Sequence, residues 1–149
     1  MRRPQPLPLV SRPASRPRVS TWAAAYVPRW LQRPPFTTLV DAQLWVVTLV
    51  TRPRTFRRML AVHHRLRAVP GLTCGTHRYG GIGYRIGGTE VAHLHGDGLL
   101  DAYLGAARAR RVRAAGLAAA HHGDGGAGWV TLDLGAASAA DVWRVLAAA

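Results

Sequence analysis

The chain contains no lysine and no asparagine, one cysteine, and seven acidic residues among its 149 residues. A single cysteine, Cys74, cannot form a disulfide within the chain, so the cysteine content does not require an oxidising compartment. All 20 basic residues are arginine, and alanine, glycine and proline are abundant. This composition is typical of a GC-rich genome, which accounts for part of the arginine excess. The formal net charge of +13 is therefore weak evidence for a nucleic-acid-binding protein.

The positive charge is concentrated in the first half of the chain. Residues 1–70 hold 13 arginines and one acid, a net charge of +12, whereas residues 71–149 carry only +1. The second half therefore has the charge balance of an ordinary globular domain. The expected partner is a small-molecule ligand, on the ground of the histidines described below rather than of the charge. Binding of nucleic acid or an anionic membrane by the Arg-rich half is the alternative, and no named nucleic-acid-binding motif supports it.

No apolar run is long enough to cross a bilayer. The best candidate runs from Leu39 to Val50 and includes Asp41 and Gln43, whereas a spanning helix needs roughly 20 apolar residues. Prolines interrupt the N-terminal segment where the apolar core of a secretory signal would stand. We expect a cytoplasmic protein, with peripheral attachment through an interfacial helix as the alternative.

The chain divides into three predicted regions. Residues 1–20 are rich in Pro, Arg and Ser and contain too little apolar surface to fold, so they predict a disordered tail. Residues 21–68 predict a basic helical lead-in, with two helices from Phe36 that are divided near Pro53. Residues 69–149 predict an α+β domain.

The pattern within the α+β domain changes with position. After Gly71, three short alternating segments separated by glycine pairs predict an antiparallel β-meander. Apolar spacing from Leu100 to Ala107 predicts a helix directly after the meander, and a hairpin and a closing helix that begins at Ser138 follow. The predicted order is β-β-β-α-β-β-α: an antiparallel sheet with helices packed on it, preceded by two N-terminal helices.

Histidines gather in the predicted sheet. His93 and His95 alternate along one segment and therefore project from the same face, together with Val91, while Glu90 has the opposite parity. His77 lies on the first predicted strand, and His121 comes just before the last. Paired imidazoles can bind a metal or transfer protons. A polar pocket without a metal is the favoured interpretation. A transition metal at His93 and His95 and purely structural histidines are the alternatives, and no cofactor is predicted.

One metal motif is matched only in part. Gly87 and then His93-Leu94-His95 match the opening of the cupin metal motif, which next requires a glutamate four or five residues beyond the second histidine. Leu99 and Leu100 occupy those positions, and too few strands follow for a cupin barrel.

Several short motifs together resemble the luciferase domain family, whose named type is the fungal luciferase and which has many short bacterial members. The resemblance covers about residues 69–148 and departs from the family pattern at Gly125-Gly126-Ala127, where a Pro-Asp-Ser run is common. Its motifs here are Pro70-Gly71, His77-Arg78-Tyr79-Gly80-Gly81, His93-Leu94-His95-Gly96, His121-His122 and Gly128-Trp129.

The resemblance implies a chemistry. Fungal luciferases oxygenate a hydroxylated aromatic pyrone with O₂, which requires a base to form the substrate anion and cations to hold it. For this chain the resemblance implies at most an oxygenase-like enzyme without a cofactor, and whether it is an enzyme stays open. The candidate site residues are His77, Arg78, His93, His95, Asp97 and His121.

Each candidate has an expected role. One of His93 and His95 would act as the base, and the other would orient it or the substrate. Arg78 would anchor an anionic substrate, because a guanidinium stays charged. Asp97 would hydrogen-bond an imidazole and favour its protonated form.

Overall fold

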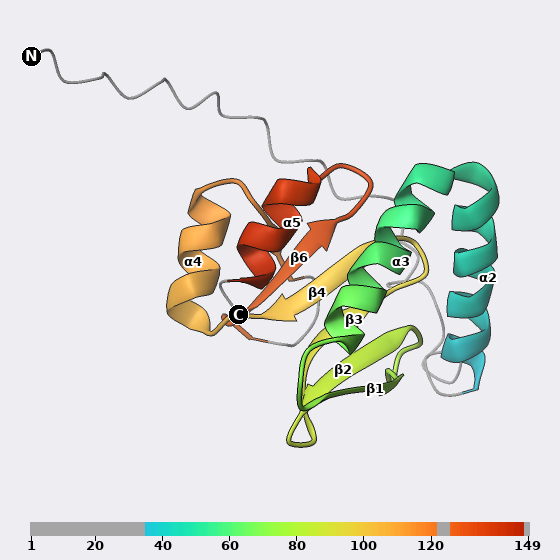
Figure 1. Cartoon of the computed structure of the whole chain (residues 1–149), viewed down its shortest axis with the longest axis horizontal. Helices are drawn as coiled ribbons and strands as arrows, with labels where there is room; N and C mark the ends of the chain where they lie inside the picture. The colour runs from blue at the N-terminus through green and yellow to red at the C-terminus, as the bar shows by residue number, and fades with distance from the viewer. Residues whose placement is uncertain (1–34, 122–125, 148–149) are drawn as a thin grey trace, which may run out of the picture.

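The computed structural model describes residues 35–121 and 126–147 and confirms an α+β fold. The predicted tail at residues 1–20 and His122 lie outside the described residues. The helices and strands, shown in Figure 1, are α2 (Phe36–Thr51), α3 (Pro53–Arg67), β1 (Leu72–Thr76), β2 (Ile82–Ile86), β3 (Thr89–Leu94), β4 (Leu99–Tyr103), α4 (Ala106–Ala114), β5 (Ala119–Ala120), β6 (Trp129–Asp133) and α5 (Ala139–Leu146).

Local sequence explains several of these boundaries. Proline stands at the first position of α3, where its missing N–H needs no partner, so the predicted division near Pro53 is confirmed. The hydroxyl of Ser138 accepts a hydrogen bond from the amide of Asp141 at 3.1 Å and caps α5. The three-stranded meander is confirmed as β1, β2 and β3.

The prediction that a helix follows the meander directly is wrong. Residues 99–103 form a fourth strand, β4, and the helix begins only at Ala106. The apolar spacing from Leu100 fits a helix, but in the strand Leu100 and Ala102 alternate onto the buried face. Gly105 adopts a φ of 73° between the two elements, which separates strand from helix.

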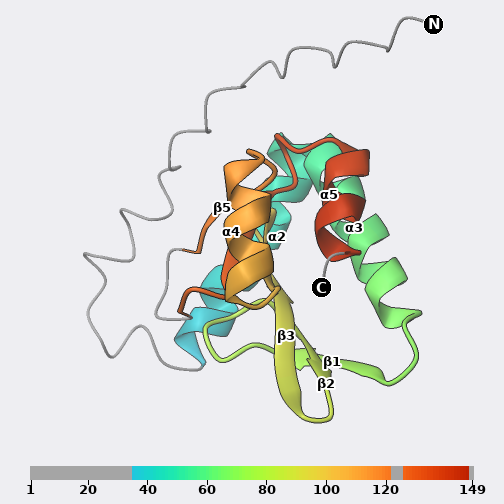
Figure 2. The same cartoon turned by 90° about the vertical axis from the view of Figure 1, so that its left-hand side faces the viewer.

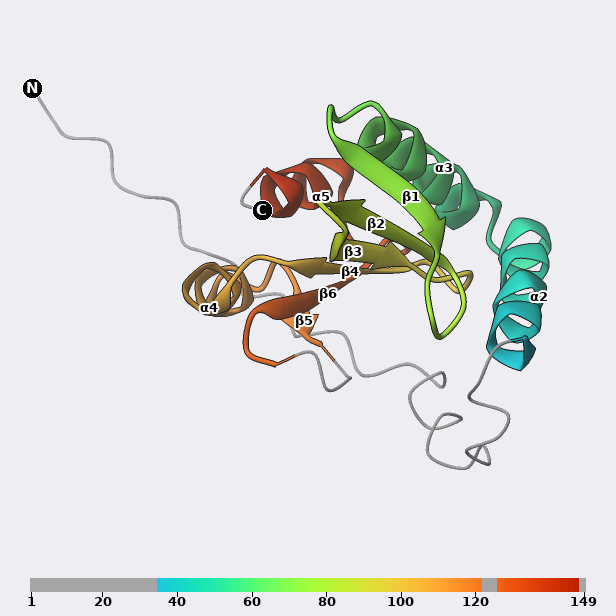
Figure 3. The ribbon, with the colours of Figure 1, turned by 90° about the horizontal axis from the view of Figure 1, so that it is seen from below.

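The strands form one antiparallel sheet in the order β1-β2-β3-β4-β6-β5. One face of the sheet forms the hydrophobic core. The apolar side chains that the paired strands contribute to this face are almost fully buried. Helices α3 and α5 lie side by side on one side of the sheet (Figure 2, Figure 3). The core residues supplied by the strands are Tyr84, Ala92, Leu94, Leu100, Ala102, Val130 and Leu132, and those supplied by the helices include Met59, Val62, Val142 and Val145.

Helix α2 buries polar rather than apolar residues. Asp41 and Thr48 are buried and the half-buried Trp45 packs against the core, whereas most of the large apolar side chains of the helix are exposed. The helix forms the outer edge of the molecule beside α3 (Figure 1, Figure 3). The exposed apolar residues of α2 are Phe36, Leu39, Val40, Val46, Val47, Leu49 and Val50. None of the described helices is long and apolar enough to cross a membrane.

Candidate functional site

A row of residues in register crosses the second face of the sheet, opposite the core. Gly83 on β2 pairs with His93 on β3, His93 pairs with Asp101 on β4, and Asp101 pairs with Thr131 on β6. Residues paired across strands share a face, so the polar side chains of this row meet. The result is a buried polar cluster: His77, His93 and Asp101 are only 8%, 6% and 0% exposed.

A β-bulge adds Glu90 to this cluster. Tyr84 pairs with Ala92, but Arg85 pairs with Glu90, so Val91 is an extra residue in β3. An extra residue reverses the alternation of side chains on either side of it. The sequence-based assignment of Glu90 to the opposite parity is therefore wrong, because it assumed a regular strand.

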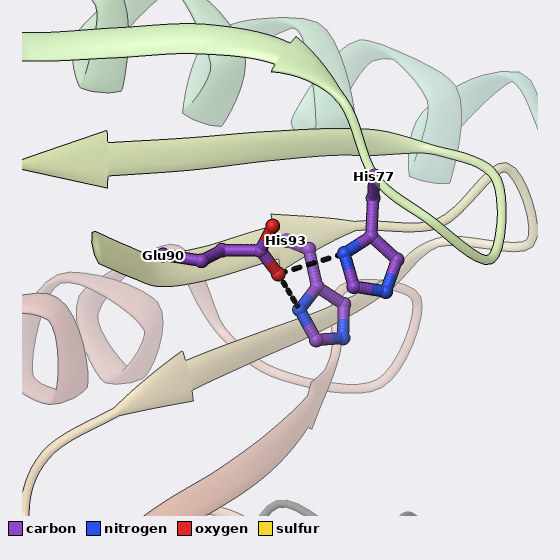
Figure 4. Close-up of side chains that lie close together, drawn as sticks. All are labelled: His77, Glu90 and His93. Carbon is purple, nitrogen blue, oxygen red and sulfur yellow. Dashed lines mark hydrogen bonds and ion pairs between the residues drawn. The ribbon is translucent and has the colours of Figure 1, made fainter. Parts of the chain in front are cut away.

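The Glu90 carboxylate lies between two imidazoles. Its Oε1 atom is 2.7 Å from Nδ1 of His77 and 3.0 Å from Nδ1 of His93, and Figure 4 shows both rings meeting this one oxygen. The two rings stack with centroids 4.0 Å apart and planes 14° apart. The other oxygen, Oε2, is 3.0 Å from the guanidinium of Arg85, a permanent cation that pairs with this carboxylate.

A glycine makes room for Glu90. A methyl group at Gly83 would lie 2.7 Å from Oε2 of Glu90 and 3.1 Å from the guanidinium of Arg85. The carboxylate therefore lies across the surface of β2 at Gly83, where any side chain would occupy its place.

Asp101 is the second carboxylate of the cluster. Its Oδ2 atom is 3.0 Å from Nε2 of His93 and 3.3 Å from Nε2 of His95. Its Oδ1 atom is 3.0 Å from Nδ1 of His121 and accepts a hydrogen bond from the hydroxyl of Thr131. Burial alone would raise the pKa of Asp101, but these contacts more than offset burial and hold the pKa well below its usual range.

The histidines respond to the two carboxylates in opposite ways. Burial lowers the pKa of His77, and its contact with Glu90 opposes only part of that shift. Burial alone would lower the pKa of His95, but the adjacent carboxylate of Asp101 outweighs it and raises the pKa. The cluster thus contains one imidazole that favours the neutral form and one that favours the protonated form.

Asp97 and Asp41 act on His95 at longer range. The charges of both carboxylates contribute to its raised pKa. The carboxylate of Asp97 accepts a hydrogen bond from the amide of Leu99 at 3.1 Å. Asp41, on α2, lies 4.0 Å from Nδ1 of His95 and binds the amide of Gly96 at 2.8 Å. Asp97 therefore acts on the imidazole through its charge, and its carboxylate stabilises the turn before β4.

Arg78 lies at the edge of the cluster rather than inside it. The residue is exposed, and its guanidinium lies 4.3 Å above the ring centroid of Tyr79. The Tyr79 ring in turn meets His77 edge-on, with centroids 5.7 Å apart. The structure thus brings together His77, His93, His95 and His121, and leaves Arg78 one side chain further out.

Aromatic rings border the cluster on β6 and β4. The ring of Trp129 lies 5.3 Å from His93 and 5.8 Å from His121, centroid to centroid. Tyr103, which is 48% exposed, lies 5.6 Å from Trp129. The planes of these two rings are tilted 55° to each other, so each offers its own apolar face beside the cluster.

A cavity of about 270 Å³ lies between α2 and the sheet. None of the six candidate site residues is among its lining residues. Asp41 belongs to both features, since it lines the cavity and approaches His95. The lining residues are Thr38, Asp41, Ala42, Trp45, Thr76, Gly81 and Ile82.

Sequence reasoning did not select four residues that contact the candidate histidines, namely Glu90, Asp101, Asp41 and Trp129. Asp101 could have been found by folding the chain about the Gly-rich turn after His95, which pairs it with His93. Asp41 could not, because its contact with Gly96 joins segments 55 residues apart.

Two sets of three donor side chains could hold a metal ion among the described residues. One set is His77, Glu90 and His93, and the other is His93, His95 and Asp101; in each set the donor atoms lie within 4.8 Å of one another. His93 belongs to both sets because its two ring nitrogens face different carboxylates.

Comparison with known proteins identifies a family for the C-terminal part of the chain. Residues 88–149 match the family model described as Luciferase domain. No curated protein and no solved structure gives a significant match. The matched segment contains most of the cluster, whereas His77 precedes it. The resemblance noted from the sequence is thus confirmed over residues 88–149, which are similar to the luciferase domain, whereas the motifs at residues 70–81 precede the match.

Proposed function

We propose that the chain is a small-molecule enzyme in which the histidine–carboxylate cluster forms the anion of a hydroxylated aromatic substrate for oxygenase-like chemistry. The observation that carries this proposal is the buried pair of His77 and Glu90, with Nδ1 and Oε1 2.7 Å apart. Nδ1 of His77 makes no well-aligned hydrogen bond among the described residues, but the negative charge of a carboxylate at this distance favours the tautomer with the proton on Nδ1. The lone pair then lies on Nε2, which points away from Glu90 in Figure 4.

The surroundings of the pair support this chemistry. The lowered pKa of His77 keeps its imidazole neutral and able to accept a proton. Removing the proton from a phenol-like hydroxyl gives an electron-rich oxygen anion, the form of a hydroxylated pyrone that reacts with O₂. The ring of Trp129, which lies beside His93, offers a face on which a planar substrate can stack, and the tilted ring of Tyr103 borders it.

Arg78 is proposed to anchor the anion from the rim. Its guanidinium is exposed and lies over Tyr79, whose ring touches His77. An exposed cation at the edge of a buried site can attract an anionic substrate and can be replaced at little structural cost. Its role concerns binding rather than proton transfer.

The test measures O₂ consumption by the full chain with a hydroxylated 2-pyrone as substrate. We expect His77→Gln to lower kcat about a hundredfold, the contribution typical of a lost general base. The added methyl group of Gly83→Ala would push the carboxylate end of Glu90 away from His77. Because His77 itself remains, we expect a smaller loss of kcat, about tenfold.

Matched variants separate these effects from general damage. His64→Gln changes an exposed histidine on α3 and should retain the wild-type rate, and Arg78→Ala should raise KM more than it lowers kcat. Wild-type O₂ consumption by both His77→Gln and Gly83→Ala would exclude the proposed base.

The exposed face of α2 supports a second candidate function, attachment to an anionic membrane surface. Val46, Val47 and Val50 are 60%, 51% and 73% exposed on this helix. Arg54 and Arg57 are exposed at the start of α3, directly after it. Apolar side chains that enter the lipid interface next to exposed arginines are typical of interfacial helices.

Vesicle flotation tests this attachment. The full chain should bind phosphatidylglycerol vesicles more tightly than phosphatidylcholine vesicles, and Val50→Glu should weaken binding about tenfold, the loss expected when one buried apolar side chain becomes charged. Ile86→Glu, which changes a half-exposed residue on β2, is the control. Equal binding by wild type and Val50→Glu would contradict the proposal, and concentration-dependent dimerisation without vesicle binding would assign the face to a second copy.

A further inference from the structure

Three side chains of the cluster converge in a way that acid–base chemistry alone does not explain. His93 and His95 come from one strand and Asp101 from the next, and Nε2 of each imidazole faces the same carboxylate oxygen. The two rings are nearly perpendicular, at 86°, with centroids 4.9 Å apart. Their nitrogens therefore approach the oxygen from different directions.

That oxygen is buried without a hydrogen bond. Among the described residues, Oδ2 of Asp101 has no hydrogen-bond partner, although two imidazole nitrogens lie 3.0 and 3.3 Å away. The two imidazoles attract this oxygen by charge, but without a well-aligned donor it has lost its water without a full replacement. Ligands held about 2.1 Å from one ion are roughly 3.0–3.4 Å apart, so both contacts have the spacing of neighbouring metal ligands.

The opposite side of each donor faces a second residue, in hydrogen-bond contact for His93 and at longer range for His95. Nδ1 of His93 lies 3.0 Å from Glu90, and Nδ1 of His95 lies 4.0 Å from Asp41. Carboxylates behind ligating histidines fix the ring orientation and leave Nε2 for the metal. The other oxygen of Asp101 is held by Thr131 and His121, which leaves Oδ2 for coordination.

The alternative set of donors is less suited to a cation. Glu90 in that set already pairs with the guanidinium of Arg85 at 3.0 Å, so its charge is largely neutralised. The same guanidinium would also repel an ion bound between His77 and His93.

We propose that His93, His95 and Asp101 bind one divalent first-row transition-metal ion. Two histidines and one carboxylate that leave other positions open form a set used by non-haem iron oxygenases. The sequence favours a pocket without metal because the glutamate of the cupin motif is absent. In the structure Asp101, on the neighbouring strand, supplies a carboxylate instead. The inference deepens the proposed function. Only the role of the ion, which would offer an open position to a substrate oxygen, rests on that function.

The test uses the tag-free full chain after treatment with a chelator, titrated with Zn²⁺ by calorimetry and with Co²⁺ by visible absorption. We expect one ion per chain and Co²⁺ bands typical of nitrogen–oxygen ligation. His95→Gln and Asp101→Asn should each weaken Zn²⁺ affinity at least about a hundredfold, and Glu90→Gln about 10–100-fold through the orientation of His93.

The controls distinguish this site from incidental binding. His64→Gln should leave affinity and stoichiometry unchanged, because His64 is exposed on α3. If Asp101→Asn does not fold, His95→Gln decides, since His95 lies nearer the surface with 18% of its side chain exposed. Equal binding by wild type, His95→Gln and Asp101→Asn, or no stoichiometric binding, would overturn the proposal. None of these measurements needs a substrate, so failure of the oxygenase proposal would leave this result intact.

Discussion

Replacing Asp101 by alanine is expected to lower the free energy of unfolding by about 4 kcal/mol, which corresponds to a fall in Tm of roughly 15 °C for a domain of this size. The carboxylate is fully buried and lies between three imidazoles and one hydroxyl. Without this carboxylate, the imidazoles and the hydroxyl remain buried but lose the negative charge that stabilises them. Each buried polar group that loses its partner costs about 1–3 kcal/mol.

The comparison with asparagine separates charge from shape. Asp101→Asn keeps the size of the side chain and one carbonyl oxygen, so Thr131 retains an acceptor. We therefore expect it to lose less stability than Asp101→Ala, in denaturation by urea followed by circular dichroism. Asp141→Ala is the control: Asp141 is a carboxylate on α5 that pairs with the exposed Arg144 and should contribute less than about 1 kcal/mol. A loss at Asp101 no larger than this control would mean that the carboxylate does not hold the cluster together.

The sequence predicts the meander well and the strand after it poorly. Glycine pairs separate β1, β2 and β3, and turn glycines are strong local information. Five residues at 99–103 provide too few positions to distinguish a strand from the start of a helix by periodicity. What decides is burial of Leu100 and Ala102 between β3 and β6, which depends on pairing that the local sequence does not contain.

The sequence indicates that histidines gather on the sheet, and it selects Asp97 as a candidate carboxylate but neither Glu90 nor Asp101. His93 and His95 share a face because strand alternation holds between them. Glu90, the only glutamate in the chain, reaches that face through a bulge at Val91, and a bulge has no reliable local sequence pattern. The motifs that resemble the luciferase domain contain the histidines of the cluster. Asp101 lies between these motifs, so the resemblance does not point to it.

Replacing Gly96 by alanine is expected to cost about 3 kcal/mol of folding free energy, near the upper end of the usual cost of overpacking. A methyl group there would lie 2.5 Å from the carbonyl oxygen of Asp41 and 2.7 Å from the amide nitrogen of Trp45. Both atoms belong to the backbone of α2, so no side-chain rotation can relieve the contact. The whole helix would have to move away from the turn after β3.

That displacement would reach the cluster. The amide of Gly96 donates a hydrogen bond to Oδ1 of Asp41 at 2.8 Å, and the same oxygen lies 4.0 Å from His95. We therefore expect Gly96→Ala to lower both the urea midpoint and the Zn²⁺ affinity. Gly75→Ala is the matched control, because a methyl group at Gly75 would meet only the guanidinium of Arg85 at 3.3 Å, the end of a flexible side chain. If Gly96→Ala were as stable as Gly75→Ala, α2 would not pack against this turn, and its carboxylate would have no part in orienting His95.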